Sequence, residues 1–148
     1  MANHLRQQIR ERVGTLLTGL TTTGSNVFQS RIYPLQQSSL PGILIYTNEE
    51  ESEYLSVGDT RLIESRLSLS IEAYCQGTSN FDDTIDTISK EVQIAISGDR
   101  FLNGLAKEVM LSTTEISFDG STEKPIGFIS LIYVVSYHFD ENAPDVAK

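Results

Sequence analysis

Residues 126–139, IGFISLIYVVSYHF, constrain the fold more than any other part of the sequence. They are rich in β-branched and aromatic residues, which predicts a β-strand. A strand with one solvent-facing side normally alternates apolar and polar residues, but here both faces are apolar. One face carries Ile129, Leu131, Tyr133, Val135, Tyr137 and Phe139, and the other carries Ile126, Phe128, Ile132 and Val134. We therefore expect the chain's own helices to cover one face and a neighbouring subunit to cover the other.

The size and composition predict a single globular domain over residues 1–148. The chain has 148 residues, of which 39% are hydrophobic and 21% are charged. A chain of this length buries roughly 68% of its unfolded surface on folding, enough for a core of its own. No apolar run reaches the ~20 residues of a membrane-spanning helix, and the N-terminal residues lack the apolar segment of a signal peptide. The single cysteine, Cys75, cannot form an internal disulfide.

The charge balance argues against tight binding of nucleic acid. The net charge is −9, from 11 basic and 20 acidic residues. Such a chain repels phosphate groups, so DNA is expected at most to pass near it. The alternative is that the acidic charge only keeps the protein soluble.

The order of predicted elements favours an α+β fold. Helical spacing and strand alternation predict helices at 3–20 and 79–98, and strands at 26–33, 43–47, 60–75, 107–119 and 126–139. Asn3 is the expected cap of the first helix, Ser79 and Asp82 form a capping box for the second, and Gly98 ends it. A change of phase predicts a β-bulge near Thr113. The expected architecture is one mixed or antiparallel sheet, with two helices on one face and a protruding β-hairpin or loop arm.

The predicted core combines the apolar stripes of the two helices with one face of the strand at 60–75. Its helix residues are Leu5, Ile9, Val13, Leu16, Leu17, Leu20, Phe81, Ile85, Ile88, Val92, Ala95 and Ile96, and its strand residues are Leu67, Leu69, Ile71, Ala73 and Cys75. The polar segment from about residue 140 onward is expected to be mobile.

The arm at residues 48–59 is unusually acidic, with Glu49, Glu50, Glu51 and Glu53 close together. One interpretation is a solvated loop. The other is an acidic surface that lines a channel or meets a basic partner, with Arg61 and Arg66 as its complement in a neighbouring copy. On the second interpretation, the candidate residues for a subunit interface or channel lining are Glu49, Glu50, Glu51, Glu53, Arg61 and Arg66.

The sequence contains no pattern typical of catalysis. His4 and His138 have no second metal ligand at suitable spacing, and Cys75 lies on the apolar phase of its strand. Asp82 and Asp83 are adjacent, so on a helix they point about 100° apart and suit the helix dipole better than acid–base chemistry. We therefore expect no enzyme activity, no catalytic residue, no metal site and no cofactor.

Three stretches together resemble a known protein family. They are residues 16–35 (LLTGLTTTGSNVFQSRIYPL), 40–54 (LPGILIYTNEEESEY) and 105–137 (LAKEVMLSTTEISFDGSTEKPIGFISLIYVVSY). Over roughly residues 3–145 the chain resembles the minor tail protein U, or tail terminator, family of long-tailed bacteriophages. No cofactor or catalytic residue carries over from that family.

The resemblance implies a structural protein of the virion neck, assembled in the host cytoplasm. Such a protein forms a homo-hexameric ring that caps the tail tube, ends its polymerisation and provides the docking surface for the head connector. Its partners would be the tail tube protein and the head–tail connector proteins, with DNA only passing through the channel and no membrane involved.

Three alternatives remain open at this point. The first is a head–tail joining or tail completion protein of the same neck. The second is a monomeric α+β module that binds a small ligand in a cleft between sheet and helices. The third is a hydrolase, which would rest only on scattered carboxylates.

Overall fold

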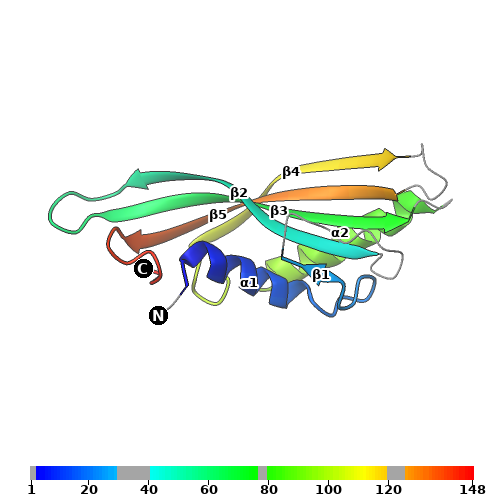
Figure 1. The fold of residues 1–148 in the computed structure, drawn as a ribbon, viewed down its shortest axis with the longest axis horizontal. Helices are drawn as coiled ribbons and strands as arrows, with labels where there is room; N and C mark the ends of the chain where they lie inside the picture. The colour runs from blue at the N-terminus through cyan, green and yellow to red at the C-terminus, as the bar shows by residue number, and fades with distance from the viewer. Residues whose placement is uncertain (1–2, 30–40, 77–79, 120–125) are drawn as a thin grey trace.

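The computed structural model describes residues 3–29, 41–76, 80–119 and 126–148 and shows two helices against one five-stranded sheet (Figure 1). The elements in chain order are α1 (Leu5–Leu17), β1 (Val27–Phe28), β2 (Gly42–Tyr54), β3 (Leu62–Gln76), α2 (Phe81–Ser97), β4 (Glu108–Asp119) and β5 (Ile126–Asp140). The strand order is β1-β2-β3-β5-β4; β1 runs parallel to β2, and the other neighbours are antiparallel. The predicted α+β fold with one mixed sheet is confirmed.

The core lies between the two helices and one face of the sheet. In β3 and β5, every second side chain is buried on this face: Leu67, Leu69, Ile71, Ala73, Cys75, Ile129, Leu131, Tyr133, Val135, Tyr137 and Phe139. Each Leu, Ile or Val side chain buried there stabilises the fold by about 1.5–3 kcal/mol relative to its exposed state. The predicted phase of both strands is therefore confirmed.

The helices present the predicted stripes to this core. Leu5, Ile9, Val13 and Leu17 of α1 and Phe81, Ile85, Ile88, Val92 and Ile96 of α2 are buried, whereas Leu16, Leu20 and Ala95 pack at its margin. Gly127 of β5 lies so close to the Phe81 ring that an added Cβ would overlap the ring. This position therefore requires glycine for close packing of α2 on the sheet.

The helix ends differ in detail from the prediction. His4, not Asn3, caps α1, because its Nδ1 accepts a hydrogen bond of 3.0 Å from the backbone N–H of Arg6. Asn80 occupies the cap position of α2, and Ser79 of the predicted capping box lies outside the described residues. Asp82 and Asp83 lie in the first turn of α2, where the helix dipole favours them, and Gly98 caps its end as predicted.

Two strand boundaries were predicted wrongly or only in part. The first predicted strand, 26–33, is a strand only at Val27–Phe28, and its residues from 30 onward lie outside the described residues. The second, predicted at 43–47, continues to Tyr54 as β2. Its glutamates have low strand propensity, but pairing with β3 along this whole stretch outweighs that preference.

β2 and β3 thus form a long hairpin that protrudes beyond the helices (Figure 1). The protruding arm expected from the sequence is confirmed as a β-hairpin. The predicted bulge in β4 is also confirmed, because the register with β5 shifts between Leu111 and Thr113. The turn expected after Asp119 lies outside the described residues.

The C-terminal residues lie against α1 and the end of β5. The backbone N–H of Leu5 donates to Pro144 O at 2.9 Å, and that of Lys148 donates to His138 O at 2.9 Å. The Lys148 ammonium lies 3.2 Å from the Asp140 carboxylate. These contacts connect the C-terminal segment to α1 and β5. The mobility expected for this segment stays a prediction.

Candidate assembly interface

A bulge in β2 sorts the acidic residues of the hairpin onto two faces. Thr47 pairs with Leu69 and Glu50 with Leu67, so β2 contains one extra residue between these two pairs. One extra residue reverses the alternation of all side chains that follow. Glu50 therefore lies on the helix side of the sheet, together with Leu67. Glu51 pairs with Arg66 on the opposite side.

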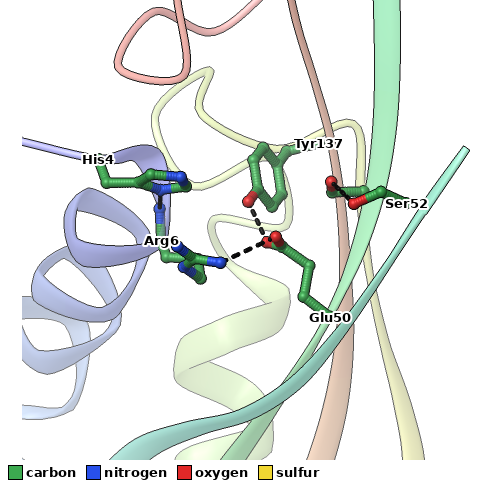
Figure 2. Close-up of polar contacts among 6 residues, drawn as sticks. His4, Arg6, Glu50, Ser52 and Tyr137 are labelled. Carbon is green, nitrogen blue, oxygen red and sulfur yellow. Dashed lines mark hydrogen bonds and ion pairs between the residues drawn. The ribbon is translucent and has the colours of Figure 1, made fainter. Parts of the chain in front are cut away.

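Glu50 joins three parts of the fold at the base of the hairpin (Figure 2). Its Oε2 accepts a hydrogen bond of 3.0 Å from Arg6 Nη1 of α1, and its Oε1 accepts one from the Tyr137 hydroxyl of β5. The Glu50 side chain is only 15% exposed. Burial, followed by the hydrogen bond to Glu50, raises the pKa of Tyr137, which therefore stays a neutral donor. The predicted interface residue Glu50 thus has partners inside its own subunit.

The two predicted arginines also have acidic neighbours in the same chain. Arg61 Nε donates to Glu141 Oε2 at 2.7 Å, and Arg61 Nη2 donates to Oε1 at 3.3 Å, a two-pronged contact. This contact raises the pKa of Arg61 and lowers that of Glu141. Arg66 Nη1 lies 3.8 Å from Glu53 and 3.9 Å from Glu64.

Glu49, Glu51 and Arg66 meet on the sheet face opposite the helices. With Ser68 and Val134 they line a shallow hollow of about 290 Å³. Of the six predicted interface residues, the structure therefore brings Glu49, Glu51 and Arg66 together here, with Glu53 beside Arg66, and separates Glu50 and Arg61 from them. Their role at a subunit contact or in a channel stays a prediction.

The same face carries the second apolar row of β5. Ile126, Phe128, Ile132 and Val134 are half-buried, and both helices lie on the other side of the sheet (Figure 1). Met110 of β4 pairs with Val134 and is 62% exposed. Further along, towards β1, Leu44, Ser70 and Glu72 of this face are buried. The apolar surface is thus concentrated where β4 and β5 run side by side.

Sequence reasoning missed a buried carboxylate on this face. Glu72 is buried, and it accepts hydrogen bonds from the hydroxyls of Tyr46 and, at 2.7 Å, Tyr74. The Tyr74 ring stacks on Phe128 with ring centres 5.2 Å apart. Glu72 and Tyr74 lie on the same face of β3 because side chains alternate along a strand, but only the register with β2 brings in Tyr46.

The structure also places the residues for which the sequence predicts no catalytic or metal-binding role, namely Cys75, His4 and His138. Cys75 is buried, and burial raises the pKa of its thiol to about 11. Burial, with Arg6 as the next cause, lowers the pKa of His4. His138 Nε2 lies 4.0 Å from Glu64.

Within the described ranges, no group of three or more His, Cys, Asp or Glu side chains is placed to hold a metal ion. No helix in the described part of the chain has the length and apolar character needed to span a membrane.

No protein family and no curated protein matches the sequence. Among solved structures, a chain in the virion of a native gene transfer agent particle is similar to this one, with a TM-score of 0.44, 11% sequence identity and coverage of 92% of each chain.

Proposed function

We propose that this protein is a structural component of a long-tailed phage virion, a tail terminator. In this role it forms a homo-hexameric ring on the tail tube, ends tube polymerisation and offers a docking surface to the head connector. The ring belongs to the virion neck, and DNA passes through its channel.

One observation supports this proposal above all others: strand β5, which lies between β3 and β4, is apolar on both faces. The helices cover the face of Leu131 and Val135, whereas Ile132 and Val134 lie on the face without a helix. Apolar surface of this kind marks a contact with another protein. The resemblance of residues 16–35, 40–54 and 105–137 to the tail terminator family indicates which kind of assembly this is.

The distribution of charge is consistent with a ring around DNA. Glu49, Glu51 and Glu53 are exposed on the protruding hairpin, whereas Glu50 is held by Arg6 and Tyr137. Exposed carboxylates on a channel wall would repel phosphates and let DNA slide without sticking. In a contact between subunits they would instead pair with basic groups, and salt would screen them over about 8 Å.

Light scattering after size-exclusion chromatography tests the proposal, with the protein alone and mixed with purified tail tubes. We expect a hexamer in solution or, if assembly needs the tube, a six-fold ring at one tube end. A protein that stays monomeric in both samples and does not bind the tubes would contradict the proposal. That outcome would favour a monomeric ligand-binding module.

A further inference from the structure

His4 holds the first turn of α1 through both its side chain and its backbone. Its Nδ1 accepts a hydrogen bond of 3.0 Å from the N–H of Arg6, and its backbone O accepts from the N–H groups of Gln7 and Gln8 at 2.9 and 3.1 Å. The first N–H groups of a helix have no partner within the helix itself. The imidazole of His4 therefore supplies an acceptor that the α1 backbone lacks.

An imidazole that accepts at Nδ1 carries no proton on that nitrogen. In the neutral form one nitrogen donates and the other accepts, whereas in the charged form both nitrogens donate. The hydrogen bond from the Arg6 N–H therefore exists only while His4 is neutral. Protonation sets two N–H groups against each other and adds a positive charge at the positive end of the helix dipole.

The charged groups that act on the His4 imidazole come from α1, β2 and the C-terminal segment. Burial first, and then the charge of Arg6, lower its pKa, and Glu50 and Asp145 oppose them with a smaller effect. Tyr137 of β5 donates to Glu50 and stays uncharged, because burial raises its pKa (Figure 2). Histidine ordinarily titrates near 6.5, so the fold favours the neutral imidazole down to a pH below that value.

The first turn of α1 connects segments that are far apart in the sequence. Leu5 is fully buried, and its N–H donates to Pro144 O of the C-terminal segment at 2.9 Å. Arg6 Nη1 donates to Glu50 Oε2 at 3.0 Å, at the base of the hairpin (Figure 2). Opening this turn would therefore release the C-terminal segment, separate α1 from the hairpin and uncover an apolar side chain.

We propose that His4 is a pH-sensitive cap of α1, and that its protonation opens the first turn and breaks the contact between Arg6 and Glu50. The direction follows from the lowered pKa of His4. The stability that the neutral imidazole contributes is complete above about pH 6.5, and it is lost as the pH falls from 6.5 through the pKa of the folded state. The device lies within one subunit, so it does not depend on the proposed function.

Hydrogen exchange of single amides, followed by NMR at about pH 7.5 and about pH 5, tests the cap on either side of the ordinary histidine value. Protection is expressed relative to an unstructured peptide at the same pH, which removes the chemical effect of pH on exchange. In the unmodified protein, protection at Leu5, Arg6 and Gln8 should fall by about 2- to 30-fold, as expected for the loss of one side-chain cap. His4→Asn caps without titrating and should show no such fall. His138→Asn, at the other histidine, is the control and should show the same fall as the unmodified protein.

Equal falls in the unmodified protein and in His4→Asn, or no fall in the unmodified protein, would overturn the inference. A second measurement uses the unmodified protein alone, so it does not depend on how the variants fold. In an NMR pH titration, the imidazole nitrogens of His4 and the amide of Arg6 should shift with one common midpoint, and the side-chain carboxyl carbon of Glu50 should follow. An imidazole that titrates while the Arg6 amide stays unchanged would overturn the inference. Neither measurement involves subunit assembly or tail tubes, so both remain decisive if the proposed function fails.

Discussion

Glu50 is a side chain that links the hairpin to the rest of the fold by polar contacts. Its carboxylate lies between Arg6 and the buried Tyr137, so helix α1, the hairpin base and β5 share one polar contact (Figure 2). A carboxylate that is mostly removed from water is stable only while its partners remain. The cluster therefore connects the base of the hairpin to α1 and β5.

We expect Tyr137→Phe to lower the free energy of unfolding by about 1.5–3 kcal/mol, the usual value of a hydrogen bond to a charged group. Urea denaturation measures this. Tyr133→Phe is the matched control, because Tyr133 is also buried in β5 and its hydroxyl has no hydrogen bond within the described residues. An equal loss in both variants would mean that the contact to Glu50 contributes nothing specific.

Alkaline pH is expected to destabilise the fold. Burial raises the pKa of Cys75 from 9.0 to about 11 and that of Tyr133 from 10.0 to about 12. Both groups then keep their protons in the folded state at pH values where the unfolded chain has lost them. The free energy of unfolding should therefore fall as the pH rises from about 9 to about 12. Urea denaturation at intervals across this range measures it. A flat profile would show that neither group stays protonated in the fold.

At the scale of elements, the periodicity of apolar residues predicted the helices and strands correctly wherever one face of the element is buried. The strand at 60–75, the helix stripe from Phe81 to Ile96 and the two-sided final strand all lie as predicted, because alternation and helical spacing reflect which face is buried. The extension of β2 was missed, because its glutamates form a strand only by pairing with β3. The bulge before Glu50 has no local sequence pattern that predicts it.

The candidate site was predicted less well than the fold, for the same physical reason. A run of adjacent glutamates does not show which of them faces the helices, since one extra residue in β2 reverses every side chain after it. Arg61 lies far from Glu141 in the sequence, and only the fold places them in contact.

We expect Leu69→Ala to lower the free energy of unfolding by about 2–5 kcal/mol, because it removes a buried side chain that packs between sheet and helices. Ser68→Ala is the control, because Ser68 directly precedes Leu69 and its side chain lies on the opposite face of the sheet. A loss of under about 0.5 kcal/mol at Leu69 would mean that β3 does not pack on the helices in this phase.

At the scale of the whole molecule, the glutamates of the hairpin should separate into two classes. Glu50→Gln should lower stability, because Arg6 then loses its carboxylate partner. The double variant Glu49→Gln with Glu51→Gln should change the free energy of unfolding by less than about 0.5 kcal/mol, because both side chains are exposed.

The same double variant distinguishes the two assembly roles. If Glu49 and Glu51 line a channel, it should assemble normally but slow the ejection of DNA. If they contact a neighbouring subunit, it should weaken the ring, and the unmodified ring should lose stability as salt is added. Normal assembly, tail length and ejection together would indicate a solvated surface with no role in the neck.

The length of tails in particles made without this protein tests the central proposal most directly. Electron micrographs of a phage that lacks the gene should show tails longer than normal, because no ring stops tube polymerisation, and supplying the protein should restore a single length. Tails of normal length that lack heads would contradict a terminator and indicate a head–tail joining protein instead. Normal particles would contradict any role in the neck.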